Sequence, residues 1–379
     1  MSQPVQSQLT RPWVDWTARQ IHDPVWRLRY LQSMDPPLLR APRWASWRFV
    51  GVLTFLALGL VAAPLSLRML DTAHAASPPM PALPPIHRAE VAAAPSADVW
   101  LVEKTNGFET YSNGLRIENQ YAVSHRPRAY LAFSAADPEG IAGEKRTDPA
   151  GIVYHTTESL QAPFESSHSN LLKRVGESLI GYTRRRRCYH FLIDRFGRVF
   201  RIVNESDAAN HAGHSVWADD RYFYVNLNDS FIGISFEAQT GAAESGTSVG
   251  NAQVRAAAVL TEMLRSRYRI PGGNCVTHAQ VSVNPANMQI GYHVDWASSF
   301  PFEMLGLPDN YATPSPAVLL FGFAFDTSFE QRAGARLAAG AVDAARGLVE
   351  RAGTAHLTLA AYRKALHRRY WKIMASHHG

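Results

Sequence analysis

The chain has 379 residues, of which 46% are hydrophobic and 18% charged, and its formal net charge is +6. This length accommodates one large domain with appended segments, or two domains, each with a full hydrophobic core. Its two cysteines exclude a disulfide-rich scaffold and a thiolate-rich zinc site. The modest charge, without a recognisable nucleic-acid-binding motif, argues against nucleic acid as a partner.

Residues 1–48 are predicted to be cytoplasmic and residues 49–67 to form a transmembrane helix. The stretch from Phe49 to Leu67 contains no charged residue. As a helix it would span about 28 Å, close to the ~30 Å hydrocarbon core of a bilayer. Seven arginines precede it, whereas Arg68 is the nearest cation after it. The positive-inside rule therefore places the N-terminus in the cytoplasm and exports everything after the helix.

A cleavable signal peptide is the main alternative for this region. Ala73-His74-Ala75, followed by Ala76, fits a small-x-small cleavage site, although the leader of residues 1–48 is long for such a signal. A buried core helix is less favoured, because no polar face interrupts the apolar run. Residues 68–98 are rich in Pro and Ala from Ser77 onward and are predicted to be a semi-rigid spacer.

Residues 99–147 are predicted to be a β-rich lead-in and residues 148–302 the catalytic core. Within the core, apolar runs typical of strands alternate with two helical stretches of 3.6-residue period, Ser169–Tyr182 and Asn251–Tyr268. This alternation predicts an α/β fold with a central mixed β-sheet flanked by helices. Residues 303–379 are predicted to form a loop and then two helices, a helical C-terminal tail.

Two histidines stand at the ends of short apolar runs in the core. His155 lies in Gly-Ile-Val-Tyr-His-Thr-Thr, and His278 lies in Cys-Val-Thr-His-Ala-Gln. Both runs have the β-branched and aromatic content of buried strands, so each histidine is expected at the end of a strand. Three further motifs lie between them: Tyr189–Phe200, Asn210–Ser215 and Ile232–Glu237.

In their order and spacing, these five motifs resemble the zinc-dependent N-acetylmuramoyl-L-alanine amidases. That family includes amidase-type phage lysozymes and peptidoglycan recognition proteins. The resemblance covers the predicted core and neither end of the chain. It implies the family's fold and a Zn²⁺ ion with His155 and His278 as two of its ligands. A zinc ion with three protein ligands and one open position supplies an activated water and a polarised carbonyl.

The third zinc ligand departs from the family pattern, which has an Asp or Cys shortly after the second histidine. Alignment on the following motifs places Gln289 or Asn284 there, and neither is a good zinc ligand. His293 and Asp295 are the nearby groups that zinc prefers. We expect His293 to be the ligand, because a three-histidine site leaves the open position that catalysis requires. Asp295 and a lost third ligand remain alternatives.

Three further residues are candidates for catalysis or substrate binding. Tyr189 matches the catalytic tyrosine of amidase-type phage lysozymes, where its phenol would stabilise the developing oxyanion; a purely structural strand tyrosine is the alternative. Glu237 shares a strand face with Ser235, the position at which cytoplasmic muropeptide amidases carry their catalytic Glu, and is a possible base. His211 matches a family histidine near the substrate and is the substrate-binding candidate, with a turn-capping role as the alternative.

The sequence therefore predicts a single-pass inner-membrane protein with its catalytic domain in the periplasm. Its expected reaction is hydrolysis of the amide bond between N-acetylmuramic acid and L-alanine in peptidoglycan by a zinc-activated water. The alternative is a non-catalytic peptidoglycan-binding module on the same fold. The expected partners are peptidoglycan and the membrane. Whether Cys188 and Cys275 form a disulfide stays open at this point.

Overall fold

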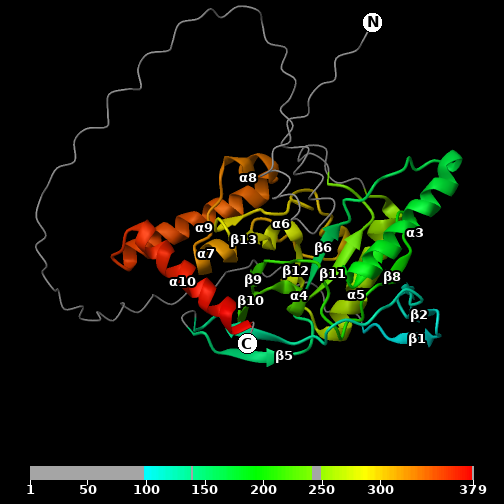
Figure 1. Ribbon diagram of the computed structural model, residues 1–379, viewed down its shortest axis with the longest axis horizontal. Helices are drawn as coiled ribbons and strands as arrows, with labels where there is room; N and C mark the ends of the chain where they lie inside the picture. Colours follow the sequence, from blue (N-terminus) through cyan, green and yellow to red (C-terminus); the bar gives the residue numbers. More distant parts are fainter. Residues whose placement is uncertain (1–97, 138–139, 241–248, 378–379) are drawn as a thin grey trace, which may run out of the picture. The chain divides into compact units, whose positions relative to one another are not determined.

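The computed structural model describes residues 98–137, 140–240 and 249–377 (Figure 1). The predicted leader, the predicted transmembrane segment of residues 49–67 and nearly all of the predicted spacer lie outside these residues. Within the described ranges, no helix combines the length and the apolar character needed to cross a bilayer.

The core is an eight-stranded mixed sheet in the order β1-β2-β3-β8-β7-β11-β6-β12. Its strands are β1 (Leu101–Lys104), β2 (Phe108–Tyr111), β3 (Arg116–Glu118), β6 (Gly151–Thr156), β7 (Phe191–Ile193), β8 (Val199–Arg201), β11 (Phe231–Phe236) and β12 (Cys275–Thr277). The strands β7, β11, β6 and β12 run parallel to their neighbours in this set. Because β6 and β11 are buried along their whole length, both read as continuous apolar runs rather than alternating ones. The predicted central mixed sheet is confirmed.

Two long helices cover opposite faces of this sheet. Side chains alternate along β7, so Leu192 packs with Leu179 and Ile180 of α3 (Ser169–Arg186). Its neighbours on β7 pack instead in the cluster that includes the buried face of α5 (Asn251–Tyr268). Both predicted helices therefore exist, and they flank the sheet as expected.

A second sheet and the C-terminal helices pack together. Its four strands, in the order β5-β4-β10-β9, are β4 (Tyr130–Ser134), β5 (Gly143–Arg146), β9 (Val216–Ala218) and β10 (Tyr222–Val225). The C-terminal helices are α7 (Pro316–Phe321), α8 (Thr327–Arg332), α9 (Ala335–Thr354) and α10 (Leu359–His377). Phe321 of α7 and Tyr370 of α10 share a buried cluster with Phe223 of β10. The orange and red helices of Figure 1 are thus packed onto the body of the protein rather than forming a detached tail.

The remaining elements are short. They are α4 (Leu227–Ser230), α6 (His278–Val281), the hairpin β13 (Val283–Asn284) and β14 (Gln289–Ile290), and the 3-10 turns η1 (Ser166–His168), η2 (Gly272–Asn274) and η3 (Glu303–Leu305). The two cysteines do not form a disulfide with each other; Cys275 is buried in β12 and Cys188 is half-buried after α3.

Candidate active site

His155 is the fifth residue of β6, next to the strand's carboxyl end. It pairs in register with Ser235 of the neighbouring parallel strand β11. Because side chains alternate, Tyr154 points toward the α5 face and His155 toward the opposite one. The imidazole is almost completely buried, at 1% exposure. The strand therefore holds this side chain in one orientation.

His278 follows β12 directly and is the first residue of α6. The side chain of Gln280 accepts a hydrogen bond from the backbone N–H of Thr277 at 2.8 Å, which fixes the start of the helix. Since β12 pairs with β6, the two imidazoles lie side by side, with ring centroids 4.5 Å apart. The two strand-end histidines thus meet at the carboxyl edge of the sheet, where ligands of parallel sheets commonly bind.

Asp295 joins the two histidines from a loop. Its Oδ1 lies 2.8 Å from His278 Nδ1, and its Oδ2 lies 3.2 Å from His155 Nδ1. The next residue, Trp296, has a left-handed backbone (φ 58°) and is buried against Phe236 and Phe300. A left-handed conformation costs a bulky residue about 1–3 kcal/mol, which the burial of the indole offsets. This buried tryptophan therefore anchors the loop that presents the carboxylate.

Asp295, rather than His293, completes a group that can hold a metal ion. The ligand atoms of His155, His278 and Asp295 all lie within 4.8 Å of one another, and all three residues are buried. His293 is not in this group. Its ring stacks on that of His278, with centroids 4.4 Å apart. The structure thus groups Asp295, which the sequence had offered as an alternative, with the two histidines, and it leaves the expected ligand His293 outside this group.

Burial sets the charges in this group. It lowers the pKa of His155 to about 4, with a further decrease from the neighbouring His278, while Asp295 opposes the shift. Burial alone would raise the pKa of the Asp295 carboxyl, but His278 and His155 hold it well below its ordinary value. At neutral pH a carboxylate thus faces an uncharged His155.

His211 lies behind His155 and contacts that imidazole. His211 Nε2 is 3.2 Å from the carbonyl oxygen of Phe231, and His211 Nδ1 is 3.1 Å from His155 Nε2. Burial lowers the pKa of His211 well below its ordinary value, so this ring is uncharged at neutral pH. In one neutral tautomer His211 donates to Phe231 through Nε2 and accepts from His155 Nε2 at Nδ1. That arrangement leaves Nδ1 of His155, which faces Asp295, available to bind a metal ion.

These residues fit a zinc ion. Asp295 Oδ2 lies 3.2 Å from His155 Nδ1 and Asp295 Oδ1 lies 2.8 Å from His278 Nδ1, so one ion could contact all three side chains. In addition, Nε2 of His278 is buried and has no hydrogen-bond partner in the described part of the chain. Two imidazoles and a carboxylate are a typical ligand set for catalytic zinc. The bond from His155 to His211 is the outer contact that orients a ligating histidine.

His211 is thus a partner of His155 rather than a residue of an open cleft. It is only 9% exposed. Its ring packs on Gly233 so closely that a Cβ at that position would lie 2.5 Å from the imidazole Cγ. A second buried side chain contacts the same carbonyl, because Arg128 donates to the Phe231 oxygen at 3.2 Å. The substrate-binding role expected for His211 has no support in these contacts.

Tyr189 does lie at the group of three. It follows α3 in a left-handed conformation (φ 64°), and its ring centroid is 5.2 Å from that of His155. Burial raises the pKa of the phenol, so the hydroxyl remains a proton donor at neutral pH. Ser235, the residue paired with His155, opposes this shift. The protonated phenol thus lies beside His155.

Glu237 is directed elsewhere. Its Oε2 accepts the backbone N–H of Arg195 at 3.2 Å, in the turn between β7 and β8. Burial raises the pKa of its carboxyl. The alternation that places Glu237 on the face of Ser235 ends with the strand at Phe236, so the side chain turns toward that hairpin. These contacts give Glu237 a structural role in the hairpin.

Residues 145–290 match the family model of N-acetylmuramoyl-L-alanine amidase. The expected family resemblance is confirmed for this part of the chain. The amidase-like segment, as we call residues 145–290, contains His155, Tyr189, His211 and His278, but not Asp295. No curated protein sequence matches the chain.

Three solved structures are similar to parts of the chain. The amidase AmiD from E. coli, in complex with anhydro-N-acetylmuramic acid-L-Ala-D-gamma-Glu-L-Lys, is 22% identical over 41% of this chain and 56% of its own, with a TM-score of 0.32. AmpDh3 from Pseudomonas aeruginosa, in complex with anhydromuramic pentapeptide, is 22% identical over 41% of this chain and 58% of its own, with a TM-score of 0.30. The Drosophila peptidoglycan recognition protein SD is 19% identical over 42% of this chain and 84% of its own, with a TM-score of 0.26. The chain thus spans little more than half of the first two.

Proposed function

We propose that the chain is a zinc-dependent hydrolase of the amide bond between N-acetylmuramic acid and L-alanine in peptidoglycan. The observation that carries the proposal is the convergence of His155, His278 and Asp295, whose ligand atoms all lie within 4.8 Å of one another. The match of residues 145–290 to the amidase family model supports the substrate class. AmiD and AmpDh3 were solved with muropeptides of this chemistry.

His155, His278 and Asp295 would hold the zinc ion. When bound there, zinc supplies a Lewis acid that polarises the scissile carbonyl and lowers the pKa of a water. With zinc on Nδ1 of His155, His211 would accept a hydrogen bond from His155 Nε2 and so orient that ring, and Asp295 would neutralise part of the charge of the ion. The phenol of Tyr189 donates a hydrogen bond to the carbonyl oxygen as that atom gains negative charge, and this donation is stronger in the transition state than in the substrate.

Zinc content and stem-peptide release, measured on the purified full-length chain, test this function. We expect one zinc per chain, loss of peptide release after chelation and its recovery on adding zinc. Peptidoglycan binding without any peptide release, in a preparation with full zinc, would refute the enzyme and indicate a binding module.

Replacing His211 with Phe is expected to weaken zinc binding by about 10- to 100-fold, the usual effect of losing a contact that orients a ligand. The ring is kept, but the acceptor for His155 Nε2 is lost. Zinc affinity would be measured by competition with a chelator. His214→Ala is the control, because His214 belongs to the same sequence motif but is exposed. Equal zinc affinities in the His211 variant and the wild type would show that the contact between His211 and His155 does not support metal binding.

We also propose that residues 49–67 anchor the chain in the inner membrane and place the amidase-like segment in the periplasm. The support is the sequence, with seven arginines before the apolar run and only Arg68 close after it. A reporter active only outside the cytoplasm should work when fused after Gly379 and stay silent when fused after Ser46. The reverse pattern would place the catalytic segment away from the cell wall. A mature chain beginning at Ala76 would replace the anchor with a cleaved signal.

A further inference from the structure

A large cavity lies at the opposite edge of the sheet from the group His155, His278 and Asp295. It is lined by residues 147–150, which precede β6, and by Gly273 and Asn274, which precede β12. The candidate active site lies at the carboxyl ends of the same two strands. The six residues of β6 rise by ~3.3 Å each, so about 20 Å separates the two edges. The cavity has a volume of about 1080 Å³.

Much of this cavity is built by parts of the chain outside the amidase-like segment. Tyr130 of β4 and Glu144 of β5 come from the lead-in, and the loop of residues 308–314 comes from the C-terminal part. The segments that extend the amidase-like segment on both sides thus meet around one hollow. Its volume is slightly above the ~300–1,000 Å³ typical of sites for small ligands, so it has room for an oligomer.

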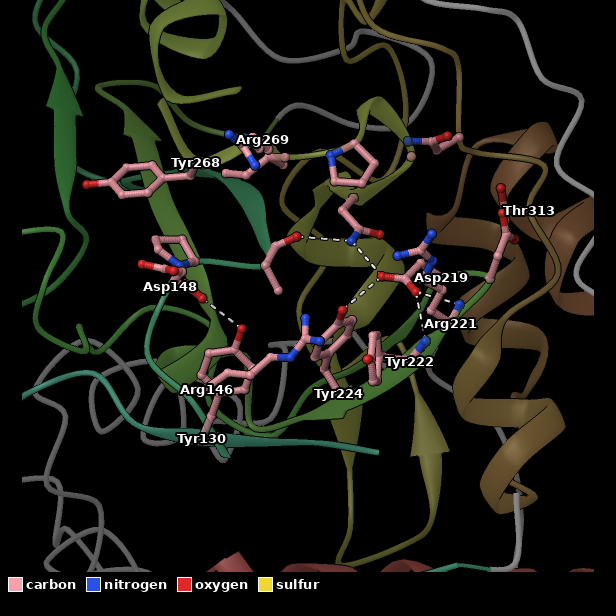
Figure 2. A pocket seen from close by; sticks show the side chains of 18 of the residues that line it. Tyr130, Arg146, Asp148, Asp219, Arg221, Tyr222, Tyr224, Tyr268, Arg269 and Thr313 are labelled. Atoms are coloured by element: carbon pink, nitrogen blue, oxygen red, sulfur yellow. Dashed lines mark hydrogen bonds between the residues drawn. The ribbon is translucent and has the colours of Figure 1, made fainter. Parts of the chain in front are cut away.

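The walls are rich in tyrosine. Figure 2 shows Tyr130, Tyr222 and Tyr224 along one side and Tyr268 on another. The hydroxyl of Tyr130 donates to the Asp148 carbonyl at 2.7 Å, that of Tyr224 to Asp219 at 2.8 Å and that of Tyr222 to Glu144 at 2.9 Å. These three bonds hold the rings in place before any ligand arrives, which reduces the entropic cost of binding.

Asp219 organises the floor of the cavity. Its carboxylate accepts from the Tyr224 hydroxyl, from Asn274 Nδ2 at 2.8 Å and from the backbone N–H groups of Arg221 and Tyr222 at 2.9 and 2.8 Å. A carboxylate with this many donors is already satisfied, so it serves as a rigid support rather than as a free anionic contact. The dashed lines around Asp219 in Figure 2 show this arrangement.

The charges around the cavity nearly cancel. Four lining residues are cationic: Lys145, Arg146, Arg221 and Arg269. Five are acidic: Glu144, Asp148, Asp219, Asp220 and Asp309. The two signs also alternate, as in the pair between Arg146 and Glu144 at 3.0 Å. A strongly anionic or cationic ligand gains little from such a surface, whereas a neutral ligand with many hydroxyl and amide groups finds donors and acceptors on every side.

We propose that this cavity binds a neutral glycan, an oligomer of N-acetylated amino sugars. Sugar rings combine apolar C–H faces, which pack on aromatic rings, with equatorial hydroxyls, which bond to paired carboxylates and guanidinium groups. Tyr222 and Arg146 together form the platform, because Tyr222 is half-buried and the Arg146 guanidinium lies over its ring, 4.1 Å from the centroid. The assignment of amino sugars rests on the proposed function, but the cavity itself does not. The cavity would hold other sugars of the glycan, about 20 Å from the sugar whose amide bond is cut.

Titration calorimetry with a soluble, peptide-free chitin oligosaccharide tests this site on the purified full-length chain. We expect binding that Tyr222→Ala weakens about tenfold, because a stacking partner contributes roughly 1 kcal/mol or more. Tyr222→Phe keeps the ring and should stay within about threefold of the wild type. Trp371→Ala is the matched control, since Trp371 is an aromatic residue 50% exposed on α10 that does not line the cavity. Tyr222→Leu provides a second variant without the aromatic face if the alanine variant does not fold.

This experiment tests the glycan site independently of the proposed enzyme activity. The oligosaccharide has no lactyl–alanine bond, so its affinity should be the same before and after chelation of zinc, whether or not the chain cleaves peptidoglycan. Absence of binding, or binding that neither Tyr222→Ala nor Tyr222→Leu weakens, would overturn the glycan site. So would a stem tripeptide whose affinity depends on Tyr222 while the oligosaccharide does not bind, because the cavity would then recognise peptide.

Discussion

Asp295→Ala is expected to abolish stoichiometric zinc binding and to lower peptide release at least about a thousandfold. The carboxylate is the only anion in the group of three, and a Lewis acid contributes several kcal/mol to stabilising the transition state. The measurement is zinc content by atomic absorption together with the rate of stem-peptide release. His155→Ala and His278→Ala should give the same double loss.

His293→Ala is the matched comparison for Asp295→Ala. His293 lies two residues away in the same loop, but its ring stacks on His278 without joining the group. We expect this variant to keep one zinc per chain. If His293→Ala instead loses the metal while Asp295→Ala retains it, the carboxylate is not the third ligand and the three-histidine site predicted from the sequence is correct.

Tyr189→Phe is expected to reduce turnover by about 10² to 10³ and to leave zinc content and folding unchanged. The substitution removes one hydroxyl, keeps the ring beside His155, and deprives the developing oxyanion of one donor, a loss that typically has this size. The effect should appear in kcat more than in KM, because the bond forms fully only in the transition state.

Tyr182→Phe is a suitable control, since Tyr182 is a half-buried tyrosine of the preceding helix α3. A Tyr189→Phe enzyme that turns over within about threefold of the wild type would make this tyrosine structural. The donor to the carbonyl oxygen would then have to be sought among the other polar groups near His155.

The helices were the easiest elements to predict. Periodicity gives Asn251–Tyr268 with the bounds that α5 has. The other predicted helix starts correctly at Ser169 but continues past Tyr182 to Arg186. Arg184, Arg185 and Arg186 form the last turn, where positive charge interacts favourably with the helix dipole. The helix ends because Arg187 adopts a left-handed conformation (φ 52°).

The two strand-end histidines were also predictable, because a strand fixes where its last side chains point. Asp295 was harder to choose over His293. The choice depends on the left-handed backbone of Trp296, which a local sequence pattern does not predict for a bulky residue. The contact of His211 with His155 depends on the close approach of the His211 ring to Gly233, a residue that is distant in sequence. Sequence reasoning identified the chemistry, whereas these long-range contacts determine which residue performs it.

Arg128 bears on how far the catalytic unit can be trimmed. This guanidinium, 2% exposed, comes from the lead-in and donates to four backbone carbonyls, those of Glu205, Asp207, Asp229 and Phe231. A fragment cut to residues 145–290 loses this guanidinium, so these buried carbonyls lose a hydrogen-bond donor. Each buried acceptor without a donor destabilises the fold by about 1–3 kcal/mol. Such a fragment also lacks the Arg128 contact to the Phe231 carbonyl, which lies 3.2 Å from His211 Nε2. The portion recognisable by family is therefore not an excisable module, and a self-sufficient fragment has to begin upstream of Arg128.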